Sequence, residues 1–302
     1  KADIVGLQEA TGNTRKIAEE LGWNYNERAQ VISRFPILDP GGADGLYVFV
    51  QPTPSTVGAV SNTHLPSTPY GPYRARHGYN QEQVLGLEGR IRLPAIQPHV
   101  EGLPPLAQEG IPVFLTGDFN SPSHLDWTEE ADAARDDMPY PMEWPVSQAL
   151  ADAGFKDSFR VVSPDPVARP GFTWTSGGPE SAKREVVDRI DWVLSLGPAE
   201  AVESNVVGES PNENVDIGIP QWPSDHRSVV STFKVSAART PDYVAAESRA
   251  YEQGDEVAVR FHVRADESVV VVPPQGEEIQ AVELTDQEAD GEYSQSTDES
   301  AP

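Results

Sequence analysis

Short apolar runs that end in polar residues recur through the first 235 residues of this 302-residue chain. The runs are rich in valine, isoleucine and aromatic residues, and several alternate apolar with polar positions, which is typical of β-strands. Turn-forming residues separate them. The pattern predicts strands over residues 4–7, 30–33, 45–50, 57–65, 111–116, 173–175, 189–194 and 229–233.

Apolar residues at helical spacing lie between these runs. They predict a helix that includes residues 17–21, a long helix over residues 80–106 interrupted near Pro94, and a short helix over residues 146–153. Residues 35–42, with two prolines and two glycines, predict a turn-rich connection. Because strands and helices mix without strict alternation, the chain is expected to form an α/β or α+β layered sandwich.

The character of the sequence changes after about residue 235. Residues 256–263 and 268–272 read as two strands around a turn, and residues 276–302 are acidic and poor in apolar side chains. We therefore expect a large domain over residues 1–235 and a small β module, perhaps truncated, with an acidic tail over residues 236–302. That tail has the composition of a disordered segment.

The charge of the chain is far from neutral. There are 48 acidic and 22 basic residues, which gives a formal net charge of −26. Two explanations remain open: adaptation to concentrated salt, where repulsion between carboxylates is screened, and a cationic partner. We favour the salt explanation, because the acids are dispersed along the chain and lysine is scarce. The absence of cysteine excludes disulfides and thiolate metal sites, so a metal would need oxygen or imidazole ligands.

No run of about 18 apolar residues is present, so no transmembrane segment is expected. The chain opens within what reads as a strand, so we expect the natural start, and any targeting signal, to lie upstream. The location stays unknown, with an extracytoplasmic one slightly favoured. The sequence leaves the oligomeric state open.

Chemically useful side chains gather at the ends of the predicted strands. Acids at a strand end raise one another's pKa unless a cation or water relieves them. Asp118 and Asn120 stand two apart on an extended segment and therefore point to the same side. The five polar clusters are residues 8–9, 62–64, 117–120, 188–191 and 224–226.

These clusters suggest metal chemistry. Magnesium prefers oxygen ligands, and Glu9 fits that role. Asp118 and Asn120 could orient a water and hold a phosphate oxygen. Asp191 could fix the tautomer of His226, as an orienting acid does in hydrolase triads. Asp188 is expected at the surface or paired with Arg189.

In this order and spacing, the clusters resemble those of the endonuclease/exonuclease/phosphatase superfamily, the DNase I-like metal phosphoesterases, over about residues 3–234. The resemblance implies a four-layered β-sandwich flanked by helices, here with a small C-terminal β appendage. It also implies roles for individual residues. Glu9 and Asp225 would serve the metal, Mg²⁺ or Mn²⁺, and the expected catalytic residues are His64, Asp118, Asn120, Asp191 and His226.

Two features qualify the resemblance. The family usually begins with a strand that ends in a metal-binding asparagine, and the sequence before Lys1 is not at hand to supply it. The stretch 69–76 lies where members of the family vary, and could place an aromatic ring and a cation beside the scissile phosphate. We take Asn62, Tyr70 and Arg74 as candidate substrate-binding residues.

The resulting hypothesis is metal-assisted hydrolysis of a phosphodiester by in-line attack of water, as in a nuclease. The negative charge would repel a long polyanion, so a phosphatase or phosphodiesterase acting on small or lipid-borne phosphates, like a sphingomyelinase, is the alternative. A second alternative is a non-catalytic binding protein that keeps the fold. The C-terminal β module is a candidate contact for a partner or surface.

Overall fold

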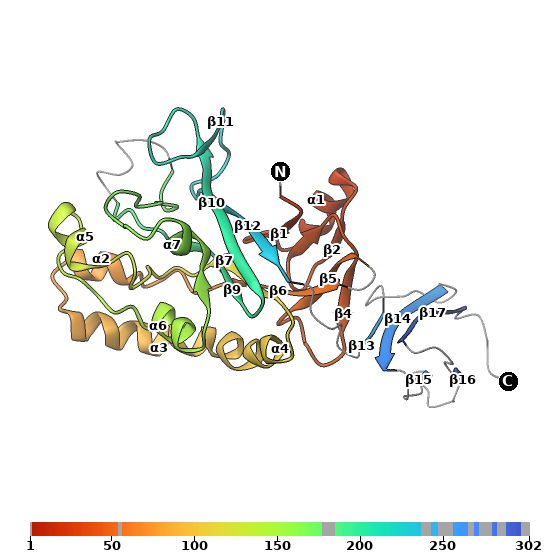
Figure 1. Ribbon diagram of the computed structural model, residues 1–302. Coiled ribbons are helices and arrows are strands. Elements are labelled where there is room, and N and C mark those ends of the chain that lie inside the picture. The colour runs from red at the N-terminus through yellow and green to blue at the C-terminus, as the bar shows by residue number, and fades with distance from the viewer. Residues whose placement is uncertain are drawn as a thin grey trace.

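The structure, a computed structural model, describes residues 2–53, 56–176 and 185–236, and five strands beyond residue 236. Helices cover one face of a large sheet, and smaller sheets lie over its other face (Figure 1). The layered α/β architecture expected from the sequence is therefore confirmed. No helix in the described parts of the chain has the length and apolar character needed to cross a bilayer.

The large sheet carries the strands whose ends matter most. Its order is β17-β14-β13-β4-β5-β6-β7-β9-β8. Strands β6 and β7 are parallel, whereas β9 runs antiparallel to β7. The strands of its first 200 residues are β4 (Ile37–Pro40), β5 (Val48–Thr53), β6 (Thr56–His64), β7 (Val113–Asp118), β8 (Lys156–Asp157) and β9 (Asp191–Leu196).

Helices pack on one face of this sheet because strand side chains alternate between its two faces. Val113 and Leu115 of β7 are fully buried in the main core, together with Ile96 of a long helix and Val146 of a shorter one. The next residue, Phe114, packs instead with the apolar cluster that includes Val31. The helices are α2 (Gly71–Arg76), α3 (Gln81–Gly102), α4 (Pro104–Gln108), α5 (Glu129–Ala134) and α6 (Pro145–Asp152).

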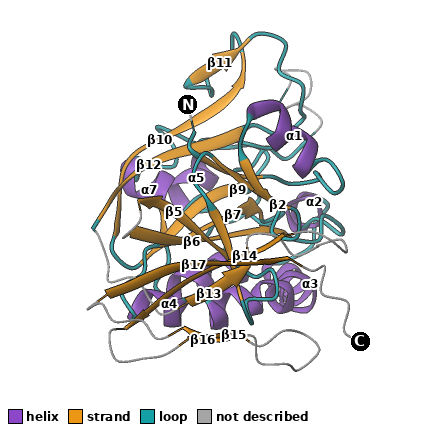
Figure 2. Ribbon diagram, turned by 90° about the vertical axis from the view of Figure 1, so that its right-hand side faces the viewer, coloured by secondary structure: helices purple, strands orange, loops and turns teal. Residues whose placement is uncertain are grey.

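The second sheet layer consists of two separate three-stranded sheets (Figure 2). One has the order β1-β3-β2 and the other β11-β10-β12. The helix α1 (Thr14–Leu21) contacts β2 and β3, and α7 (Ser158–Val162) contacts β9 and β10. The strands are β1 (Ile4–Gly6), β2 (Asn24–Asn26), β3 (Val31–Ser33), β10 (Ala199–Glu209), β11 (Ile217–Ile219) and β12 (Ser228–Val235).

Local expectations failed in several places, and one strand was missed. Helix α3 continues through Pro94 and Pro98. A proline removes one helical hydrogen bond. Here the packing of the buried face, which includes Val84 and Ile96, keeps the helix continuous. Part of the stretch 35–42 forms strand β4 because it pairs with β5. Strand β10 escaped prediction because its polar positions face outward and a bulge interrupts its alternation.

Five strands follow residue 236. Strand β13 pairs with β4, and β14 pairs with β13 and β17, so this segment extends the edge of the large sheet. The boundary at residue 235 stays a prediction. The expectation of a disordered tail is wrong for β16 and β17, since backbone pairing joins them to other strands. The strands are β13 (Tyr243–Ala246), β14 (Glu256–Arg264), β15 (Val269–Val271), β16 (Gln280–Val282) and β17 (Glu288–Ser296).

Candidate functional site

Three predicted site residues lie in one row across the large sheet. The strand register pairs His64 at the end of β6 with Asp118 at the end of β7. The same register pairs Asp118 with Asp191, which begins β9. Because neighbouring strands lie about 4.8 Å apart, this pairing brings together side chains that are separated by up to 127 positions in the sequence.

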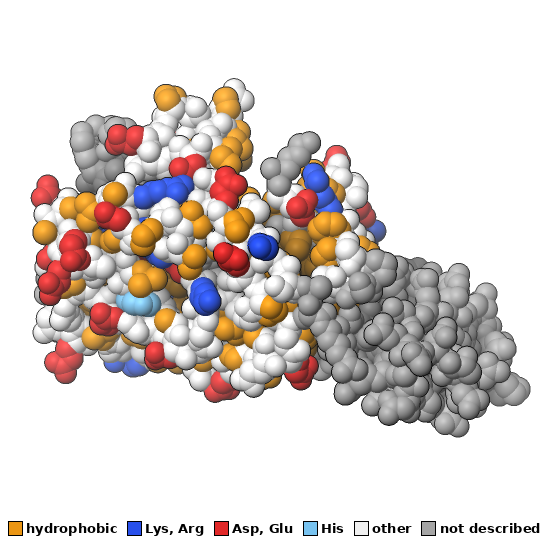
Figure 3. Space-filling model, in the orientation of Figure 1, with side chains coloured by type: hydrophobic (Ala, Val, Ile, Leu, Met, Phe, Trp, Pro, Cys, Tyr) orange, Lys and Arg blue, Asp and Glu red, His pale blue; other side chains and the backbone are white. Residues whose placement is uncertain are grey.

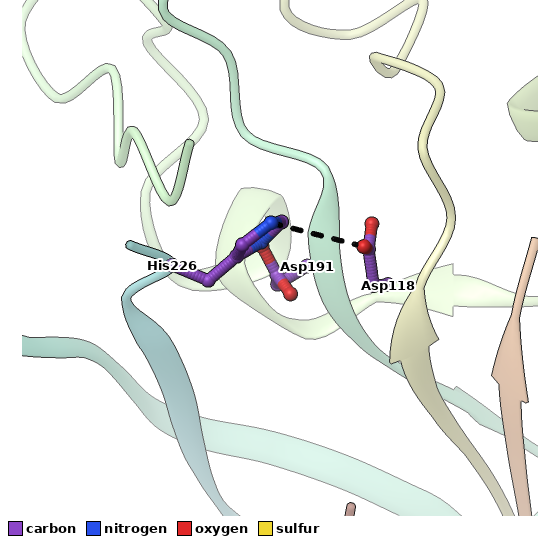
Figure 4. Close-up of side chains that lie close together, drawn as sticks. All are labelled: Asp118, Asp191 and His226. Carbon is purple, nitrogen blue, oxygen red and sulfur yellow. Dashed lines mark hydrogen bonds and ion pairs between the residues drawn. The ribbon is translucent and has the colours of Figure 1, made fainter. Parts of the chain in front are cut away.

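His226 completes the cluster from a later part of the chain. It precedes β12 and points toward the row, as Figure 4 shows. Its Nδ1 lies 3.0 Å from Oδ2 of Asp191, and its Nε2 lies 3.9 Å from Oδ2 of Asp118. The backbone of Trp174 forms an isolated bridge with His226, and the indole ring lies 4.8 Å from the imidazole ring. Trp222 donates from Nε1 to the His226 carbonyl oxygen.

The electrostatic surroundings favour a protonated His226. Burial alone would lower its pKa, but the hydrogen bond to Asp191 and the negative charges of Asp191, Asp118 and Asp225 raise it to about 9. At neutral pH the ring therefore carries a positive charge. Nδ1 donates to Asp191, which leaves Nε2–H directed toward the space beside Asp118.

Asn120 holds Asp118 in place. The backbone N–H of Asn120 donates to Oδ1 of Asp118 at 2.9 Å, and its Nδ2 donates to Oδ2 at the same distance. Nδ2 also donates to the Leu65 carbonyl oxygen. The turn requires a φ of 47° at Asn120, a left-handed conformation that asparagine tolerates better than most residues. Both amide hydrogens are used, so Oδ1 is the atom left to face a substrate or water.

His64 lies on the other side of Asp118. Its Nε2 is 3.4 Å from Oδ2 of Asp118, and its side chain is one-third exposed. The interaction with Asp118 is the largest influence and raises the pKa of His64, while burial opposes it and the charge of Glu9 adds to it. Asp118 thus faces an imidazole on each side, and Glu9 is close enough for its charge to be felt.

Glu9 follows β1, and the two residues before it are joined to β6 through Asn62. Gln8 donates to Oδ1 of Asn62 at 2.7 Å, and Nδ2 of Asn62 donates back to the Leu7 carbonyl oxygen at 2.8 Å. Oδ1 of Asn62 also accepts from Thr116. Asn62 therefore joins the two sheet layers, and its amide groups are occupied with that task. Glu9 itself is exposed, has a φ of 55°, and has no hydrogen-bond partner in the described residues.

The other predicted substrate residues share a neighbouring cavity. Tyr70 and Arg74 line a cavity of about 510 Å³ together with Tyr73 and His77. Tyr70 is buried, which raises the pKa of its phenol, and its hydroxyl donates to Asp188. Arg74 is exposed, and its guanidinium lies 5.6 Å from the centre of the Tyr79 ring. Only Arg74 of these two predicted residues offers a free polar group.

Asp225 is exposed and lies beside His226 in the sequence. Its backbone carbonyl accepts hydrogen bonds from Ser176 and Thr175, and its charge acts on the imidazole of His226. The structure therefore places the predicted metal residues Glu9 and Asp225 at the edge of the cluster, whereas Asp118 and Asp191 lie at its centre.

Asp188 corrects the expectation of a surface residue, because it is 1% exposed. Its carboxylate accepts from Tyr70 and from Nε1 of Trp127, at 2.9 and 2.8 Å. Its backbone pairs with that of Trp174, the residue that bridges to His226. Asp188 therefore ties the Tyr70 loop to the segment that positions His226. Although Asp188 lies within the polar cluster 188–191, its neighbours in the sequence carried no signal for this role.

Arg189 is also buried and does not pair with Asp188. Its guanidinium contacts Oδ2 of Asp126 at 2.8 Å and Oδ2 of Asp157 at 2.6 Å. Arg160 contacts the other oxygen of Asp126 at 2.5 Å. This network of buried charges anchors the segment directly before Asp191, since buried ions need close partners.

The cluster suits a hard divalent cation. Asp118, Asp191 and His226 each have a ligand atom within 4.8 Å of the others, and His226 would have to release a proton before it could bind a cation. Burial raises the pKa of Asp191, and the nearby charge of Asp118 raises it further. A cation would relieve this repulsion, and carboxylate oxygens are the donors that Mg²⁺ or Mn²⁺ prefers.

The chain is similar to known proteins over most of its length. The profile of the Endonuclease/Exonuclease/phosphatase family matches residues 1–226. An uncharacterized protein of Caenorhabditis elegans is 30% identical across 76% of this chain and 81% of its own length.

Several solved structures are similar at lower identity. An endonuclease/exonuclease/phosphatase from Beutenbergia cavernae is 16% identical, covering 97% of this chain and 81% of that chain with a TM-score of 0.43. A humanized D. rerio TDP2 is 18% identical, covering 77% and 86%, with a TM-score of 0.44. An AP endonuclease from Archaeoglobus fulgidus is 16% identical, covering 68% and 74%, with a TM-score of 0.42. At TM-scores this low, the structural likenesses add nothing to the family profile and the nematode relative.

Proposed function

Because the chain belongs to the endonuclease/exonuclease/phosphatase family, whose members are metal-dependent phosphoesterases, we propose that it hydrolyses phosphodiester bonds by in-line attack of water. The observation that carries this proposal is the convergence of His64, Asp118 and Asp191 from three neighbouring strands with His226 from the segment before β12. In this arrangement a carboxylate can activate a water while the two imidazoles contact a phosphate.

Asp118 is the group that we assign to the attacking water. Its Oδ2 faces both imidazoles, and Asn120 fixes the carboxylate through two hydrogen bonds. The free Oδ1 of Asn120 lies on the same amide and can accept a second hydrogen from the water. Asn120 is thus a positioning residue for Asp118 and for the nucleophile. This role differs from the phosphate contact expected from the sequence, since its amide hydrogens are already donated.

His226 and His64 are the groups that we assign to the phosphate. The imidazolium of His226 directs Nε2–H toward the space beside Asp118, where it can donate to a non-bridging oxygen as negative charge develops. Asp191 holds the ring in this orientation through Nδ1. The Nε2 of His64 approaches the same carboxylate from β6 and can donate to a second oxygen.

Glu9 and Asp225 are the residues that we assign to a divalent ion, Mg²⁺ or Mn²⁺. The carboxylate of Glu9 is exposed and unpartnered in the described residues, whereas Asp191 and His226 are committed to each other. When bound, such an ion would supply positive charge that stabilises the leaving oxyanion. The alternative ligand set, Asp118 with Asp191 and His226, predicts instead that Asp191→Asn loses metal affinity and that Glu9→Gln keeps it.

The substrate is the open part of the proposal. Nucleic acid is the first candidate through the family. A small or lipid-borne phosphodiester is the second, favoured by the net charge of −26 and by the scarcity of free cations at the centre, where Arg74 is the exposed arginine of the adjoining cavity. A long polyanion would need several Lys or Arg contacts to offset its repulsion.

The test compares bis(p-nitrophenyl) phosphate, plasmid DNA and sphingomyelin vesicles, each with Mg²⁺, with Mn²⁺ and with a chelator, at low and high salt. We expect the wild type to hydrolyse the small diester only with metal. Asp118→Asn and His226→Gln should each lower kcat at least about 100-fold.

Asp152→Asn, on the exposed surface of α6, is the matched control and should retain activity. Turnover of the small diester without cleavage of DNA at any salt concentration would reject nucleic acid as substrate. A folded wild type that is inert toward all three substrates with both metals would support the non-catalytic binding protein instead.

A further inference from the structure

A second and larger cavity lies apart from the phosphoester centre. Its volume is about 1070 Å³, and its lining includes none of the residues assigned above to metal, water or phosphate. Helices α5, α6 and α7, strands β8 and β9 and the loops between them, which include His124 and Leu125, contribute its lining. Figure 3 shows hydrophobic side chains gathered on the face where Figure 1 places α5, α6 and α7.

Apolar side chains dominate this cavity. Trp192 and Leu194 of β9 and Phe155 are buried residues that line it. At its rim, Leu125 is 39% exposed and Val161 is 52% exposed. Large apolar side chains that are exposed around a concave surface mark a binding site more often than isolated ones do.

The charged groups of the cavity are mostly satisfied within the protein. Arg160 is paired with Asp126, and Asp157 is paired with Arg189. Lys156, Glu130 and Asp165 have no salt bridge in the described residues. Lys156 and Glu130 are exposed and carry opposite charges, and the carboxylate of Asp165 accepts the backbone N–H groups of Val167 and Ala168. The cavity therefore presents no cluster of unsatisfied charges of one sign, so nothing in its lining calls for a charged ligand.

His124 supplies a polar group to the lining of the cavity. Its Nδ1 lies 2.8 Å from Oγ of Ser147, which also contacts the carbonyl oxygen of Trp144 at 3.0 Å. The other nitrogen, Nε2, has no hydrogen-bond partner in the described residues and is not among the buried polar atoms. Burial lowers the pKa of His124, so the ring is uncharged at neutral pH. Because Oγ of Ser147 donates its single hydrogen to the Trp144 carbonyl oxygen, Nδ1 of His124 donates to Oγ, and Nε2 is left as an acceptor.

We propose that this cavity binds a small, uncharged and largely apolar molecule that carries a hydroxyl group. A hydroxyl can donate its hydrogen to Nε2 of His124, whereas an ether oxygen has no hydrogen to donate. The concave shape and the volume, close to the upper end of the roughly 300–1,000 Å³ range of small-molecule pockets, suit a ligand of this size better than a flat protein surface. The ligand site is independent of the proposed phosphodiesterase activity.

The first experiment measures binding of Nile red, an uncharged apolar dye, to the full chain in the presence of a chelator. Ala133→Trp places an indole in the cavity, whereas Ala134→Trp places it on the same helix at an exposed position outside the lining. We expect Ala133→Trp to weaken dye binding at least tenfold and Ala134→Trp to leave it unchanged. Equal binding by both variants and the wild type would overturn the proposal.

The second experiment identifies the head group by displacing the dye with decanol, decanoate, decylamine or decyl methyl ether. Decanol should displace best, and His124→Phe should weaken decanol about threefold to tenfold while leaving the ether unaffected. Stronger displacement by decanoate or decylamine would assign the cavity to a charged amphiphile and reject the proposal. A concentration-dependent dimer that Ala133→Trp dissociates would assign it to a second copy of the chain and also reject it.

Discussion

The pair formed by His226 and Asp191 makes a prediction that needs no substrate. Asp191→Asn keeps the shape of the side chain and removes its charge. In the wild type, the hydrogen bond of 3.0 Å between Nδ1 and Oδ2 and the charge of Asp191 overcome burial and raise the pKa of His226 to about 9, from 6.5. The net elevation corresponds to about 3 kcal/mol in favour of the imidazolium.

The expected size of the change follows from this balance. An opposite charge in contact typically shifts a pKa by about 1 to 3 pH units, or about 1.4 to 4 kcal/mol. In Asp191→Asn the burial that lowers the pKa of His226 remains, while its largest opposing influence is lost. The pKa of His226 should therefore fall by that amount, and at pH 8 the ring should become between about half and almost fully neutral.

The assay is an NMR titration of the imidazole C–H resonances in metal-free protein, with His226→Gln used to assign the signal. Asp225→Asn is the control, because Asp225 acts on His226 through its charge alone and ranks last among the influences. Its effect should be the smaller one. An unchanged pKa in Asp191→Asn, or an equal fall in Asp225→Asn, would refute the pairing.

The other predictions concern stability and metal binding. Gly117→Ala should lower the free energy of unfolding in urea by about 1–3 kcal/mol, because a Cβ there would press on the carbonyl oxygen of Thr63, whereas Gly89→Ala, with open space around it, should not destabilise. Burial lowers the pKa of His99 from 6.5 to about 4, so the folded protein binds a proton at this residue more weakly than the unfolded chain does. The contribution of His99 to the free energy of unfolding should therefore be full above pH 6.5 and fall by about 3 kcal/mol as the pH drops toward 4. His99→Gln should reduce this dependence of the unfolding free energy on pH. Glu9→Gln should weaken Mn²⁺ binding, measured by calorimetry, at least tenfold without changing the melting temperature of the metal-free protein; unchanged affinity would move the metal to Asp118.

Much of the fold was readable from local pattern. The runs that form β6, β7 and β9 are largely apolar, and their side chains either alternate between buried and partly exposed or are buried on both faces. Polar residues stand at their ends. Helix α6 follows from helical spacing. The failures came where tertiary pairing outweighed local preference: β4 forms from a turn-rich stretch because β5 lies beside it, and α3 passes through two prolines because its buried face holds it in the core.

The candidate site divides along the same line. The sequence by itself determined which side chains stand at strand ends, including His64, Asp118 and Asp191, because strand and turn signals span only a few residues. Only the tertiary structure decided that the strand register aligns these three in one row and that His226 meets them from another sheet.

Tertiary structure also decided how the amides and buried acids are used. The amide hydrogens of Asn62 and Asn120 are donated to other groups of the protein, and Asp188 accepts hydrogen bonds from distant segments. Whether a polar group is free depends on partners far away in the chain, and a local pattern carries no information about them. The residue types fixed the chemistry available, while long-range hydrogen bonding fixed which atoms remain to perform it.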